Sequence, residues 1–136
     1  MRQLVALAML FLTACQVQGA GCAQYGPETT ELTGSLELRD YPGPPNYESV
    51  QAGDRLEQQW ILVLPSEMCV DAASPPSTEA GRVTGIREIQ LVQGPESPSL
   101  LHLRGRKIKV SGQLFSAHTG HHRTPVLLAV RQVSPN

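Results

Sequence analysis

The length of 136 residues suits a single domain. The formal net charge is −1 and only 4% of the residues are aromatic, so the chain lacks the row of aromatic side chains that stacks on single-stranded nucleic acid. No apolar stretch is long enough to span a bilayer, and the sequence contains no internal repeat and no coiled-coil heptads. These features argue against nucleic-acid-binding, membrane-spanning and repeat proteins.

The N-terminus has the features of a signal peptide. Residues 4–12 form an apolar run that is too short to cross a membrane. Residues 12–15 then read Leu-Thr-Ala-Cys, the bacterial lipobox pattern of an apolar residue, two small residues and a cysteine. This pattern predicts lipidation of Cys15, and Gln16 after it is typical of sorting to the outer membrane. The alternative is ordinary cleavage after Gly19, which would give a soluble periplasmic or secreted protein.

These signals divide the chain into two parts. Residues 1–21 are predicted to be signal peptide, lipobox and short tether, and residues 22–136 a single β-barrel domain. Lipidation of Cys15 would leave Cys22 and Cys69, and an oxidising periplasm would let these two form a disulfide. Two free buried thiols are the alternative.

Five segments are predicted to be strands, because their apolar residues alternate or form short runs between Gly and Pro. They are residues 30–39, 56–64, 83–92, 107–115 and 124–133. Pro65 is expected to end the second strand. The fifth strand is apolar on both faces, which predicts a strand that is covered on both sides or a central strand of the sheet.

One helical turn is expected at residues 100–103, between the third and fourth strands. This order predicts an all-β fold, a small five-stranded OB-like barrel. Gly34 and Gly112 suit the sharp bends that such barrels need. A small β-sandwich is the alternative, since its strands would be spaced similarly.

The loop at residues 116–125 holds three of the four histidines. Residues 120–126 read Gly-His-His-Arg-Thr-Pro-Val, which resembles the Gly-His-His-His-Thr-Pro-Val signature of the DUF4431 family. Residues 43–49, with Gly53 and Asp54 after them, resemble that family's other block. Arg123 stands where the third histidine is usual. The resemblance implies an uncharacterised bacterial envelope protein, and it supplies no activity.

Two other interpretations compete with simple binding: a metal site and a catalytic site. His118, His121 and His122 could ligate a metal ion, but adjacent residues in an extended chain point to opposite faces and no carboxylate is near them in sequence. A histidine base would need a nucleophile and an orienting acid, for which Asp54 or Glu48 is the candidate. No recognised nucleophile motif accompanies the histidines.

The sequence therefore predicts a non-enzymatic periplasmic lipoprotein, a binding or inhibitor-like module without a cofactor. The expected partner is an envelope protein or an anionic envelope component, with the membrane contacted only through the lipid anchor. All 12 acidic residues lie at or before Glu96 and six basic residues follow it, and the two sets are expected to pair across strands. The predicted binding surface comprises Tyr47, His118, His121, His122 and Arg123.

Overall fold

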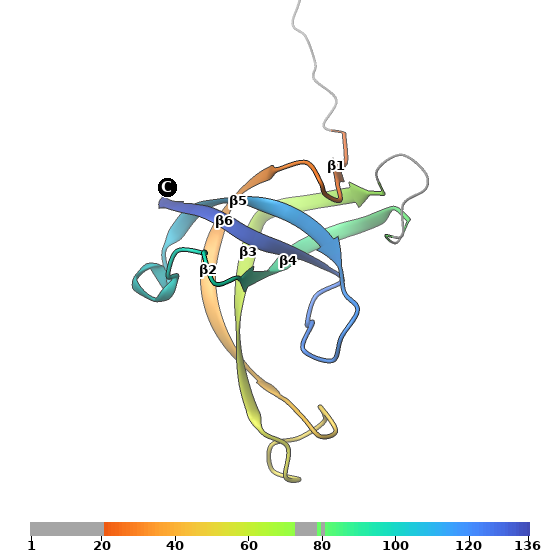
Figure 1. Ribbon diagram of the computed structural model, residues 1–136, viewed down its shortest axis with the longest axis vertical. Coiled ribbons are helices and arrows are strands. Elements are labelled where there is room, and N and C mark those ends of the chain that lie inside the picture. The colour runs from red at the N-terminus through yellow and green to blue at the C-terminus, as the bar shows by residue number, and fades with distance from the viewer. Residues whose placement is uncertain (1–20, 73–78, 80) are drawn as a thin grey trace, which may run out of the picture.

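The computed structural model describes residues 21–72, 79 and 81–136 (Figure 1). The predicted signal peptide and the lipidation of Cys15 lie outside these residues. The elements are β1 (Ala23–Gln24), β2 (Thr30–Pro42), β3 (Leu56–Asp71), β4 (Val83–Gln93), the 3₁₀ turn η1 (Leu101–Leu103), β5 (Lys107–Ser116) and β6 (Val126–Pro135). No helix in the described part of the chain is long and apolar enough to span a membrane.

Five strands close into a barrel in the order β2-β3-β4-β6-β5, with β5 returning to β2. The β4–β6 pair is parallel and the other four pairs of the barrel are antiparallel. This is the strand order of the OB fold, and η1 stands between the third and fourth barrel strands as predicted. The predicted all-β barrel is confirmed, and its closed sheet excludes the sandwich.

The prediction that Pro65 ends the second strand is wrong. β3 continues to Asp71, and its register with β4 shifts between Val63 and Met68. A bulge leaves residues without a ladder partner, so the missing N–H of proline is tolerated there. The two-residue strand β1, which pairs in parallel with the end of β3, was not predicted.

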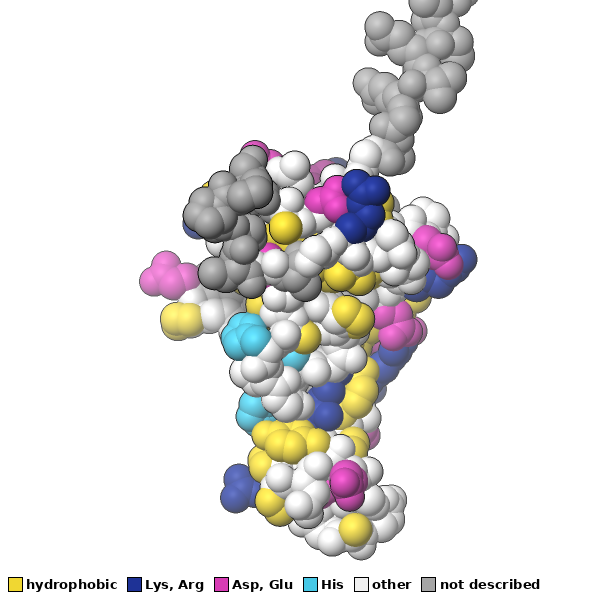
Figure 2. Space-filling model, turned by 90° about the vertical axis from the view of Figure 1, so that its right-hand side faces the viewer, with side chains coloured by type: hydrophobic (Ala, Val, Ile, Leu, Met, Phe, Trp, Pro, Cys, Tyr) yellow, Lys and Arg dark blue, Asp and Glu magenta, His cyan; other side chains and the backbone are white. Residues whose placement is uncertain are grey.

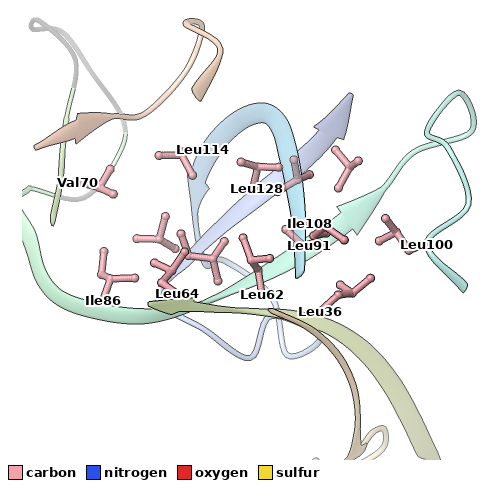
Figure 3. Close-up of a cluster of buried hydrophobic side chains, with 14 of the residues drawn as sticks. Leu36, Leu62, Leu64, Val70, Ile86, Leu91, Leu100, Ile108, Leu114 and Leu128 are labelled. Carbon is pink, nitrogen blue, oxygen red and sulfur yellow. The ribbon is translucent and has the colours of Figure 1, made fainter. Parts of the chain in front are cut away.

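The barrel interior is filled by aliphatic side chains from every barrel strand (Figure 3). Leu36, Leu62, Ile108 and Leu128 have no exposed surface. Leu100 and Leu103, next to and within η1, join this core and are each 1% exposed. The helical turn therefore contributes to the core rather than only connecting two strands.

A second buried row lies on the outer face of the barrel. Ile61, Gln90 and Leu127 are register neighbours on β3, β4 and β6, and none is more than 2% exposed. The side chains of the adjacent residues Leu62 and Leu128 point to the interior, so the first half of β6, Val126 to Val130, is covered on both faces, as predicted, whereas most of its second half is exposed. The histidine loop, residues 117–125, lies over this row at Gln90, whose side chain bonds the backbone of His121 and Arg123.

Cys22 and Cys69 form the predicted disulfide, across 47 residues of sequence. It links the beginning of the described chain to the C-terminal end of β3. The predicted pairing of acidic and basic segments is found at Lys109–Glu31 and Arg123–Glu57. The remaining arginine ion pairs join residues within the acidic segment, at Arg39, Arg82 and Arg87.

Candidate functional site

Two loops that are distant in sequence meet beside the barrel. One, residues 43–55, connects β2 to β3, and the other, residues 117–125, connects β5 to β6 (Figure 1). The Tyr47 hydroxyl lies 3.4 Å from Nε2 of His121, and the two rings are edge to face with centroids 5.5 Å apart. Gly120 lies against the Tyr47 ring, so a Cβ at this position would come within 2.9 Å of Tyr47 Cζ.

The first loop is held in shape by a buried carboxylate. Asp54 is 5% exposed and accepts the backbone N–H groups of Ser49, Glu48 and Asn46 at 2.8–2.9 Å. These three hydrogen bonds favour the charged form and lower the Asp54 pKa from its ordinary value. Within this frame Tyr47 has a φ of 59°, a left-handed conformation that non-glycine residues rarely adopt. The loop thereby fixes the direction of the Tyr47 side chain.

Glu57, at the start of β3, joins the two loops. Its Oε1 accepts a hydrogen bond from Nδ1–H of His121 at 2.6 Å, and its Oε2 accepts one from the Arg123 guanidinium at 2.9 Å. Gly43 makes room for it, because a Cβ there would lie 2.6 Å from Glu57 Cγ. A carboxylate only accepts hydrogen bonds, so the neutral form of His121 carries its proton on Nδ1, and its Nε2 lone pair then faces the Tyr47 hydroxyl.

Arg123 positions the site rather than presenting charge. Its side chain is 10% exposed, and its guanidinium also donates to the Pro42 carbonyl at 2.7 Å. The guanidinium carbon lies 5.0 Å from the Tyr41 ring centroid and 5.5 Å from that of Tyr47, within cation–π range. Arg123 therefore contacts the end of β2 at Pro42, both tyrosine rings and Glu57.

Gln90 anchors the histidine loop to the barrel. Its side-chain carbonyl accepts the Arg123 N–H at 2.6 Å, and its amide donates to the His121 carbonyl at 3.1 Å and to Gln59 at 3.0 Å. The Gln90 backbone N–H donates to Thr124 Oγ1 at 2.9 Å. The loop is thus attached through a residue that is itself 2% exposed.

His118 and His122 lie apart from His121, next to Phe115. His122 Nδ1 accepts the N–H groups of His118 and Thr119 at 3.0 and 3.3 Å, so its neutral form carries the proton on Nε2. Burial and the neighbouring histidines lower the pKa of His122 from its ordinary value. Neither ring nitrogen of His122 then offers a free lone pair to a metal ion.

Among the described residues no group of three or more His, Cys, Asp or Glu side chains is placed to hold a metal ion. The structure brings three of the five predicted site residues together, Tyr47, His121 and Arg123. It places His118 and His122 on a separate part of the loop, with their rings 4.6 Å apart.

The acid that orients His121 was assigned wrongly from the sequence. Asp54 and Glu48 were the candidates, but Asp54 is used by its own loop and Glu57 makes the contact. Glu57 and Gln90 were both missed. Each is one of several polar residues inside a predicted strand, so nothing in the sequence distinguished it from its polar neighbours.

Replacement of Glu57 by glutamine is expected to destabilise the domain by about 2 kcal/mol at pH 7, because His121 and Arg123 would lose a charged acceptor. Burial by itself would raise the Glu57 pKa, but Arg123 and His121 outweigh burial and hold it below 4.5. This stabilisation is present above pH 4.5 and is lost as the pH falls through the folded-state pKa. Urea unfolding of both proteins between pH 3 and 7 should therefore show a difference that shrinks towards acid. A difference that does not depend on pH would contradict the assignment.

The comparisons with known proteins place the histidine loop in a family. A search of curated proteins found no match. Residues 88–134 match a domain of unknown function, DUF4431. These residues include η1, β5 and the whole of residues 117–125, whereas residues 43–54 lie outside the match. The match confirms, over residues 88–134, the resemblance to the DUF4431 family that the loop signature predicted.

Proposed function

We propose that this protein is a non-enzymatic binding module of the bacterial envelope, held at the outer membrane by lipid on Cys15. It engages an envelope protein or an anionic envelope component through the surface where residues 43–55 meet residues 117–125. The observation that carries the proposal is the contact between Tyr47 and His121, 74 residues apart, in which Glu57 holds the His121 ring through Nδ1. The disulfide supports a compartment outside the cytoplasm.

The position of this contact in the barrel supports binding. OB folds use the loop between their first two strands and the loop between their last two strands to flank a ligand face. Residues 43–55 and 117–125 are these two loops here. This support is an analogy between folds, and the side chains themselves must carry the recognition.

The contacting side chains are held in advance of binding. The His121 side chain is 53% exposed, whereas those of its two supports, Glu57 and Arg123, are 16% and 10% exposed. An exposed ring on buried supports loses little conformational freedom when a partner binds. We therefore assign contact with the partner to Tyr47, His118 and His121, and positioning to Arg123 and His122.

The Glu57–His121 pair also favours a second candidate. A carboxylate that fixes Nδ1–H directs the Nε2 lone pair outward, as in metal sites and in histidine bases. The group opposite Nε2 is the Tyr47 phenol, which packs on Gly120. Metal binding is thus the first alternative and hydrolysis the second, and equilibrium dialysis with Zn²⁺ and Cu²⁺ separates the first from a binding module.

The test is capture of envelope components by immobilised protein from Gln16 onward, read by mass spectrometry. His121→Ala is expected to reduce capture of one component at least about tenfold, as truncation at the centre of an interface does. His102→Ala is the matched control, because His102 is an exposed histidine on η1. Gly120→Ala is expected to reduce capture similarly, since the new methyl group displaces the Tyr47 ring. Equal capture by the wild type and the three variants would exclude this surface as the binding site.

A further inference from the structure

The hairpin of β2 and β3 extends beyond the barrel. β2 pairs with β5 only as far as Ser35, and β3 pairs with β4 only from Trp60 onward. The two strands nevertheless pair with each other out to Pro42 and Leu56. Their distal part is therefore a two-stranded ribbon, visible below the barrel in Figure 1.

One face of this ribbon continues the hydrophobic core outward. Successive side chains alternate between the two faces, so Glu57 and Tyr41 lie on the candidate-site face and their even-numbered neighbours on the other. That other face carries the register pairs Leu36–Leu62, Leu38–Trp60, Asp40–Gln58 and Pro42–Leu56. The first pair is in the core, Leu38 and Trp60 are half-buried, and Leu56 is 57% exposed.

A hollow of about 360 Å³ lies at the tip of the ribbon, and its border includes Asp40, Glu48, Val50 and Leu56. Val50 and Leu56 are two of the three large hydrophobic side chains that are exposed among the described residues. In Figure 2 the lobe at the bottom of the view, which holds the tip of the ribbon, shows hydrophobic side chains together with acidic and basic ones. The residues that border the hollow include two carboxylates and neither lysine nor arginine.

We infer that this hollow docks a segment of a partner protein that presents an apolar side chain beside a lysine or arginine. Val50 and Leu56 supply the apolar contact, and Asp40 and Glu48 supply the complementary charge. The hydrogen bonds of Asp54 keep the tip in one conformation, which lowers the cost of docking. The inference rests on the proposed function and chooses between its two kinds of partner, because two carboxylates repel an anionic component.

The first experiment selects peptides from a random twelve-residue phage library on the chain from Gln16 onward, which contains the whole barrel. The expected binders combine an apolar residue with an adjacent lysine or arginine. Leu56→Ser should weaken each synthesised binder at least tenfold, measured by calorimetry, and should leave the fold intact because Leu56 is exposed. Leu101→Ser is the matched control, since Leu101 is 67% exposed on η1. Acidic binders, no binders, or binders that ignore Leu56→Ser would overturn the inference.

Charge reversal tests the electrostatic part of the inference. Glu48→Lys should weaken the same cationic peptides at least tenfold and should shift a repeated selection towards acidic peptides. A wild-type protein that forms a dimer dissociated by Leu56→Ser would instead make a second copy the occupant and overturn the inference. Envelope capture that is lost in His121→Ala and kept in Leu56→Ser would overturn it while the proposed function stands. Capture that is unchanged in both would remove the proposed function.

Discussion

Replacement of Gly112 by alanine is expected to destabilise the barrel by about 4 kcal/mol or more, which approaches the total stability of a small domain. Gly112 lies in β5 beside an irregular step in its register with β6. A Cβ at this position would overlap the carbonyl oxygen of Ala129 and would lie 2.9 Å from the carbonyl carbon. Both obstacles are backbone atoms of the neighbouring strand, so no rotamer change can relieve them.

Urea unfolding measured through the emission of Trp60, the single tryptophan, checks this expectation. Gly94→Ala is the matched control, because the nearest atom to its new methyl group would be Ser97 Oγ at 3.8 Å. This control should change the free energy of unfolding by less than about 0.5 kcal/mol. A loss of less than about 1 kcal/mol in Gly112→Ala would contradict the close approach of β5 and β6.

The barrel could be predicted because its signals are local. Alternation with a period of two or a short apolar run marked each of the five barrel strands. The proximity of two backbones explains both glycines that were expected at bends. Gly34 is the second of these, and a Cβ there would overlap the carbonyl oxygen of Val63. The path of β3 through Pro65 could not be predicted, since a bulge depends on the register with a neighbouring strand.

The candidate site was predicted in part. The loop signature and the resemblance of residues 43–49 to the family's other block pointed to Tyr47, His121 and Arg123, and the structure brings these together. Glu57 has no comparable signal, because its role depends on pairing opposite Tyr41 and on the position of a loop 64 residues away. Asp54 appeared available to a histidine, but N–H groups in its own loop are closer in sequence and occupy both of its oxygens.

Loss of the Cys22–Cys69 disulfide is the second large expected effect, about 4 kcal/mol for a separation of 47 residues. In the chain-entropy model the disulfide acts on the unfolded state, which becomes far less restricted when the link is removed. The closed loop contains β2 and most of β3, so the freed chain includes both strands of the hairpin that carries Tyr47 and Glu57. The double variant Cys22→Ser/Cys69→Ser, prepared from Gln16 onward, should therefore unfold at a much lower urea concentration than the oxidised wild type.

Reduction provides the control for this double variant. Dithiothreitol should lower the stability of the wild type to that of the variant and should leave the variant unchanged, because the chain from Gln16 onward has no other cysteine. A difference below about 1 kcal/mol between oxidised and reduced wild type would show that β1 and the barrel hold this end of the chain without the link. The expected larger difference makes the fold depend on an oxidising compartment. A copy kept in a reducing cytoplasm would then lose much of its stability, which agrees with the proposed envelope location.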